Sequence, residues 1–193
     1  TLFKHMAATG FKGIELAYNP YSSDPMAFEI GRCGVPISKF AINAKYESVP
    51  GFMKMLRGFG IDEVTSVHIK AGDALLELTS TEQDPARLFE EFRKLAREAI
   101  DFVSEIGGKG LVVSPTPEIG WLELYFNIID AKAKEQYIMH SIDMMRDIVK
   151  MAAEKGVEVA VRNEYWSLFR GKEIDRLLEA LDASCLYSPD LAQ

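Results

Sequence analysis

Three consecutive polar residues, Arg162, Asn163 and Glu164, directly follow the largely apolar run 157–161. The run has the composition of a buried strand, so these residues stand where that strand ends. A glutamate at such a point can remove a proton from a substrate or ligate a cation, and an arginine can hold a carboxylate or a phosphate through two hydrogen bonds. The sequence predicts that Arg162 and Glu164 face a pocket and that Asn163 holds the turn between them.

Other predicted strands also end in polar residues, namely Glu15, His68, Ser114, Asp190 and Gln193. Each has a structural alternative. Glu15 could pair with a lysine, because an unpaired carboxylate in a buried strand is costly. His68 could be a core or rim histidine, Ser114 a strand-end hydroxyl, and Asp190 the cap of a following helix.

A helix, a glycine and a short apolar strand recur along the chain and would position these residues. In the clearest unit, Asp84 can cap a helix that starts at Pro85 and stops at Gly107, and the apolar run 110–115 follows. The same order occurs in four further units, over residues 1–16, 52–69, 137–161 and 173–190. Strands that alternate with helices predict right-handed βαβ units and a parallel sheet.

The fold class is therefore α/β, and a (β/α)8 TIM barrel is favoured over an open nucleotide-binding sheet. The glycine-rich segment 107–110 precedes a strand, whereas a dinucleotide-binding loop follows one. Five strands are evident, and residues 35–44 could supply a sixth, where a barrel needs eight. We expect residues 1–193 to be a single TIM-barrel domain with its ends missing, a segment of a larger barrel.

Composition excludes several function classes. A net charge of -7 without a basic run disfavours nucleic acid as a ligand. The longest apolar runs fall short of the roughly 18 residues of a membrane span. Cys33 and Cys185 have neither metal-site spacing nor the density of a disulfide scaffold, so we expect core cysteines in a cytoplasmic protein.

The segment Gly120–Asp130 is unusually apolar for a loop, with large side chains at helical spacing. It could be a lid over the pocket or a contact between subunits. A contact in a homo-oligomer is favoured, because exposed apolar patches of this kind usually mark interfaces.

Three short motifs in order, "GFKGIEL", "GVEVAVRNEYW" and "SPDLAQ", resemble the xylose-isomerase-like sugar phosphate isomerase/epimerase family of TIM barrels, which includes inosose dehydratases, ketose 3-epimerases and hydroxypyruvate isomerases. The resemblance implies a divalent cation, manganese, magnesium or cobalt, held by Glu, Asp, His and Glu at the ends of four strands. It also implies a small carbohydrate substrate that reacts through an enediolate when a carboxylate removes a proton beside its carbonyl.

The family's site residues carry over only in part. Asp190 matches the ligand aspartate, but Gln193 stands where the family has histidine, and Arg162 stands where it has the ligand glutamate. A guanidinium about 4 Å from a divalent cation, at an effective dielectric near 20, is repelled by roughly 8 kcal/mol. Either Glu164 takes over ligation while Arg162 turns toward the carboxylates, or the site binds no metal.

The leading hypothesis is a metal-assisted isomerase, epimerase or inosose-type dehydratase of a small sugar or polyol. Glu164 would be the catalytic base and a metal ligand, Asp190 a second metal ligand, and Glu15, His68, Arg162 and Gln193 would contact the substrate. The alternative is a metal-free barrel that binds a phosphorylated or carboxylated sugar-like ligand without catalysis. An AP-endonuclease-like zinc phosphodiesterase is disfavoured by the net charge of -7 and by only three histidines.

Overall fold

The computed structural model describes residues 2–20, 36–70, 85–115, 131–162, 169, 171–182 and 184–189. Within these ranges the helices are α1 (Leu2–Ala8), α2 (Lys39–Tyr46), α3 (Val49–Gly58), α5 (Pro85–Glu105), α7 (Ala131–Glu154) and α8 (Lys172–Leu181). The strands are β1 (Gly13–Tyr18), β2 (Glu63–Ile69), β3 (Gly110–Val113), β4 (Glu158–Arg162) and β5 (Leu186–Ser188).

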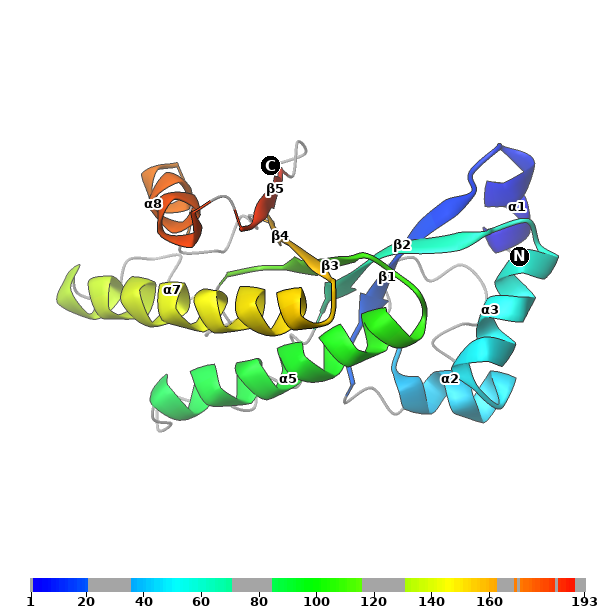
Figure 1. Ribbon diagram of the computed structural model, residues 1–193, viewed down its shortest axis with the longest axis horizontal. Helices are drawn as coiled ribbons and strands as arrows, with labels where there is room; N and C mark the ends of the chain where they lie inside the picture. The colour runs from blue at the N-terminus through cyan, green and yellow to red at the C-terminus, as the bar shows by residue number, and fades with distance from the viewer. Residues whose placement is uncertain are drawn as a thin grey trace.

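The described strands form one sheet of five, and every neighbouring pair is parallel. The strand order β1-β2-β3-β4-β5 follows the order along the chain, and a helix lies between successive strands (Figure 1). All carboxyl ends of the strands therefore lie at the same edge of the sheet. The predicted alternation of helices and parallel strands is confirmed.

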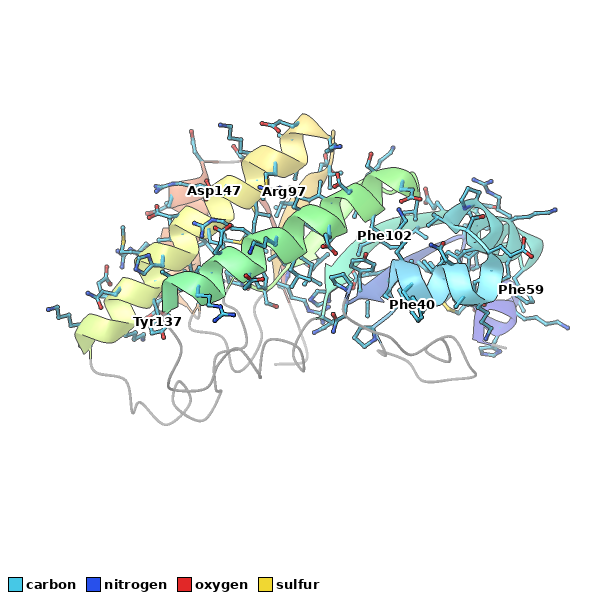
Figure 2. All side chains as sticks on the ribbon, turned by 90° about the horizontal axis from the view of Figure 1, so that it is seen from below. Phe40, Phe59, Arg97, Phe102, Tyr137 and Asp147 are labelled. Atoms are coloured by element: carbon cyan, nitrogen blue, oxygen red, sulfur yellow. The ribbon has the colours of Figure 1, made fainter. Side chains whose placement is uncertain are left out.

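One face of the sheet carries the core. α3 packs on β2, α5 on β2 and β3, and α7 on β4 and α5; Figure 1 shows α5 and α7 running side by side along the sheet. Tyr18 of β1 stacks on Phe102, the α5 residue labelled in Figure 2, with ring centroids 4.5 Å apart. Near Asp147 of α7, also labelled there, Arg93 of α5 donates a hydrogen bond to the carboxylate at 2.7 Å.

The opposite face, which we call the inner face, carries Glu15, His68, Val112 and Arg162. Their strand neighbours Leu16, Val67, Leu111 and Val161 point into the core cluster. Val112 is itself only 5% exposed but lies outside that cluster, as expected for a side chain on the other face. The polar residues of the strands thus gather on one side of the sheet.

The possible sixth strand at residues 35–44 is wrong. Ile37 makes a single parallel bridge to Tyr18, and Ser38 then begins α2 by accepting a hydrogen bond from the backbone N–H of Ala41 at 3.0 Å. Ala41 and Ile42 are fully buried on one face of this helix. The side-chain cap and the helical spacing of the apolar residues decide the conformation here.

The best-defined predicted unit matches the structure closely. α5 starts at Pro85, and the chain leaves it through Gly107 with a φ of +72°. The backbone N–H of Gly108 donates to the carbonyl of Val103 at 2.9 Å, which satisfies a terminal carbonyl of the helix. β3 follows two residues later, as the sequence predicts.

Two further expectations concern surfaces. The apolar segment Gly120–Asp130, predicted to form a subunit contact, lies outside the described residues. Among the helices that the structure does describe, none is long and apolar enough to cross a bilayer.

Candidate functional site

Three of the predicted site residues lie together on the inner face, contributed by three strands. Glu15 is on β1, His68 is the penultimate residue of β2, and Arg162 is the last residue of β4. Glu15 Oε1 is 3.7 Å from His68 Nδ1 and 3.9 Å from Arg162 Nη1. Ser66 of β2 joins them by donating its hydroxyl hydrogen to Glu15 Oε2 at 2.8 Å. We call these four residues the Glu15 cluster.

The members of the Glu15 cluster differ in how far solvent reaches them. The side chain of Glu15 is 40% exposed and that of Arg162 is 29% exposed, whereas His68 is 3% exposed. An incoming ligand would therefore meet a carboxylate and a guanidinium first, with the imidazole beneath them. Such a pair offers a hydrogen-bond acceptor and a set of charged donors side by side.

His68 is neutral at physiological pH. Burial, together with the smaller effect of the nearby positive charges of Lys70 and Arg162, lowers its pKa to about 3. The contact between His68 and Glu15 is accordingly one between a neutral ring and a carboxylate. At 3.7 Å it is also longer than a hydrogen bond. The contact between His68 and Glu15 is therefore neither an ion pair nor a hydrogen bond.

Arg162 makes a loose contact with Glu15. The two side chains are partly solvated and 3.9 Å apart, a geometry that typically contributes less than about 1 kcal/mol to stability. The contact with Glu15 therefore adds little to the stability of the fold. The structural alternative for Glu15, pairing with a lysine, is replaced by these contacts with Ser66, His68 and Arg162.

The described residues do not fit a metal ion. None of their His, Cys, Asp and Glu side chains form a group of three or more that could hold one. Glu15 and His68 would supply two ligands at most, and the Arg162 guanidinium would repel a cation placed between them. The predicted metal ligands Glu164 and Asp190, and the predicted substrate contact Gln193, lie outside the described part of the chain.

Ser66 is a member of the cluster that sequence reasoning missed. Its signal is weak but present, since Ser66 and His68 are polar residues two apart in the same strand. That spacing places both on one face. It does not reveal that Glu15 lies opposite, because the pairing of β1 with β2 is a tertiary property.

Another cleft in the described ranges lies away from the Glu15 cluster. It measures about 670 Å³ and is formed by α7, α8 and the amino ends of β4 and β5, with Arg146, Lys150 and Cys185 in its lining. Burial raises the pKa of the Cys185 thiol to about 11, so this cysteine is protonated and unreactive at neutral pH. The cleft opens at the amino end of β4, at Glu158, and the Glu15 cluster meets the opposite end of that strand, at Arg162. In α/β barrels chemistry occurs at the carboxyl ends, so we do not assign the site to this cleft.

Comparisons with known proteins identify the fold. No protein-family profile and no curated protein sequence matches the chain. Among solved structures it resembles a sugar phosphate isomerase/epimerase from Parabacteroides distasonis, with a TM-score of 0.59, 13% identity, and coverage of 99% of this chain and 59% of that one. It also resembles the D-psicose 3-epimerase of Clostridium cellulolyticum solved with D-tagatose, with a TM-score of 0.59, 15% identity, and coverage of 98% and 56%. A xylose isomerase domain protein from Planctomyces limnophilus gives a TM-score of 0.54, 13% identity, and coverage of 91% and 60%.

These similarities confirm the predicted resemblance and fold class. The five-stranded parallel sheet with its helices has the fold of part of an α/β barrel. The chain spans slightly more than half the length of the solved structures that it matches. At such low identities the likeness establishes the fold alone.

Proposed function

We propose, starting from a fold shared with sugar isomerases and epimerases, that this chain belongs to an enzyme that isomerises, epimerises or dehydrates a small sugar or polyol. The observation that carries the proposal is the Glu15 cluster. It brings a solvent-accessible carboxylate and a guanidinium together on the face of the sheet that lines the interior of such barrels. Hydroxyl-rich substrates need this mixture of acceptors and donors.

The proposed reaction begins with orientation of the substrate. Glu15 accepts a hydrogen bond from a substrate hydroxyl, Gln193 makes a further hydrogen bond, and His68 borders the site as a neutral group. Arg162 donates to the carbonyl oxygen. Holding the reacting carbon in one geometry removes much of the entropic cost of the reaction.

Proton transfer follows at the carbon beside the carbonyl. Glu164 removes the proton, the bonding electrons move to the carbonyl oxygen, and an enediolate forms. Arg162 stabilises its negative charge, which is the charge that develops in the transition state. Return of the proton to the neighbouring carbon isomerises the sugar, return to the other face of the same carbon epimerises it, and loss of water dehydrates it.

A divalent metal, manganese, magnesium or cobalt, held by Glu164 and Asp190 remains part of the proposal. When bound, it would polarise the same oxygens of the substrate. The steps above use the chain's own side chains alone, because the described residues do not fit a metal.

One observation favours a second function, a metal-free barrel that binds a phosphorylated or carboxylated sugar-like ligand without catalysis. Arg162 lies beside Glu15, and the charges of both Lys70 and Arg162 act on His68. Two positive charges against one carboxylate favour an anionic ligand. Unchanged ligand affinity in the presence of a chelator, with no turnover of any isomer, would support this second function.

Deuterium incorporation tests the enzymatic proposal. Full-length protein is incubated with ketoses or inososes in deuterium oxide, and we expect NMR spectra to show exchange at the carbon beside the carbonyl. The Glu164→Gln variant should lose this exchange, because an amide cannot take up the proton. Glu158→Gln, an exposed glutamate at the other end of β4, is the matched control and should exchange normally. Exchange at the normal rate in Glu164→Gln would refute the role of Glu164.

Other properties follow as parts of the same proposal. Residues 1–193 would form a single domain with a small carbohydrate as its ligand, in a cytoplasmic homo-oligomer. The share of apolar residues in Gly120–Asp130 supports a subunit contact there, and light scattering that gives a concentration-independent monomer would contradict it.

A further inference from the structure

β2 contains one residue more than β1 along their pairing, and this residue lies next to the Glu15 cluster. Ile14 pairs with Val64, but Glu15 pairs with Ser66, so Thr65 has no partner in β1. We propose that this β-bulge is a positioning device that places Ser66 and His68 on the same face as Glu15, and that Ser66 is a positioning residue for the Glu15 carboxylate. The effect on turnover rests on the proposed function, whereas the effect on geometry does not.

The side-chain alternation of strands explains why one extra residue matters. In a regular register Glu15 would face Thr65, and the inner face of β2 would continue with Val67 in place of His68. His68 would then point into the apolar core, and Val67 would meet the substrate side. The bulge reverses this arrangement, because β2 resumes its pairing at Ser66 with the opposite alternation.

Side-chain and backbone contacts support the bulge from both sides. The hydroxyl of Thr65 donates to the carbonyl of Ile14 at 3.1 Å, which links the extra residue to β1. A Cβ at Gly13 would lie 2.7 Å from Thr65 Cγ2, a distance that side-chain carbons do not tolerate. A Cβ at Gly110 on β3 would lie 3.1 Å from Ser66 Cβ. Two glycines thus leave the space that the bulged pair occupies.

The two carboxylate oxygens of Glu15 make different contacts. Oε2 accepts the serine hydroxyl at 2.8 Å, while Oε1 lies 3.7 Å from His68 Nδ1 and 3.9 Å from Arg162 Nη1. A charge-assisted hydrogen bond of this length fixes the rotation of the carboxylate. Oε1 is thereby held toward Arg162, where the substrate is proposed to bind.

The test combines a structural and a kinetic readout on full-length protein. The Ser66→Ala variant removes the hydroxyl, and the Ser66→Thr variant retains it. The Gly13→Ala variant adds a methyl group that would clash with the bulge. Gly58→Ala is the control, since nothing lies within 4 Å of a Cβ at that position. NMR records the carboxyl carbon of Glu15 and the imidazole nitrogens of His68 at pH 7, and kinetics records kcat and KM for deuterium exchange.

We expect Ser66→Ala and Gly13→Ala to shift the resonances of Glu15 and His68, while Ser66→Thr and Gly58→Ala leave them near their original positions. In Ser66→Ala, kcat should fall roughly 10- to 100-fold with KM within about twofold, the loss typical of a hydrogen bond to a charged group. Unshifted resonances in both Ser66→Ala and Gly13→Ala would overturn the inference. Shifted resonances in a protein that exchanges no sugar would refute the proposed function and leave the positioning role intact.

Discussion

His68 has the least accessible side chain in the Glu15 cluster, and its burial has a consequence for stability. The pKa of folded His68 is about 3, whereas that of an ordinary histidine is 6.5. Below pH 6.5 His68 binds a proton in the unfolded chain, whereas in the folded chain it stays neutral. The free energy of unfolding therefore falls as the pH drops from about 6.5 to 3, by about 1.4 kcal/mol per pH unit from this residue.

Urea unfolding at pH 7, 6 and 5 measures this dependence. We expect His68→Gln to show a shallower decrease than the parent protein, because the variant has no proton to take up. His5→Gln, which removes an exposed histidine, should keep the original dependence. Parallel decreases in the parent and in His68→Gln would contradict the assignment of His68 as a buried neutral group.

Arg162 should determine the response to anions. We expect inorganic phosphate to bind competitively with the sugar, because the partly exposed guanidinium is a charged donor to phosphate oxygens. Arg162→Gln should weaken phosphate inhibition about tenfold or more, and Arg57→Gln on exposed α3 surface should not change it. Equal inhibition constants in the parent and in Arg162→Gln would contradict this role.

At the level of single residues, the sequence predicted Glu15, His68 and Arg162 but not Ser66. His68 and Arg162 lie at strand ends as predicted, whereas Glu15, also predicted at a strand end, is the third residue of the six in β1. Ser66 could be assigned to the cluster only from the pairing of β1 with β2. That pairing contains a bulge that no local sequence pattern predicts. The predicted positions of Glu164, Asp190 and Gln193 lie outside the described residues and remain predictions.

The cap at Ser38 illustrates how a local hydrogen bond can determine whether a segment forms a helix or a strand. Residues 35–44 were interpreted as a possible sixth strand, yet Ser38 caps α2 there. The helices and strands of the five main units were predictable because each unit has apolar residues at helical spacing followed by a short apolar run. The error arose in the segment where the apolar run was too short for periodicity to distinguish helix from strand.

The Ser38 cap gives a prediction for α2. Ser38→Ala should lower the free energy of unfolding by about 1 to 2 kcal/mol, since the backbone N–H of Ala41 loses its partner in a fully buried position. Chemical denaturation measures the change, and Ser38→Asp should restore part of it. Ser184→Ala, at an exposed serine outside any helix, is the control. A change no larger than that of the control would show that the cap is not stabilising.

Across the whole molecule, the predicted barrel class rested on the alternation of helices and strands and on the lack of a dinucleotide-binding loop, and the five-stranded parallel sheet agrees with it. The register between strands could not be read from the sequence, because it depends on packing between distant segments. The same limit applies to the metal, whose predicted ligands follow β4 and β5 and lie far apart in the chain.

Manganese addition tests the metal at this scale. If Glu164 and Asp190 hold the ion in full-length protein, manganese at about 100 times its dissociation constant should stabilise the fold by roughly 2.7 kcal/mol and raise Tm by about 5 to 10 °C. The shift should vanish in Glu164→Gln and persist in Glu158→Gln. A parent protein without bound metal and without a shift would favour the metal-free function.

The strand order of the sheet has a consequence for synthesis on the ribosome. Each strand from β2 to β5 pairs with the strand made immediately before it, so the sheet can grow at one edge as the chain emerges. At every nascent length the growing edge is the newest strand, while β1 stays at the other edge of the described sheet. We expect folding intermediates of this chain to resemble shorter versions of the same sheet, and the most recently translated strand to be the segment that chaperones recognise.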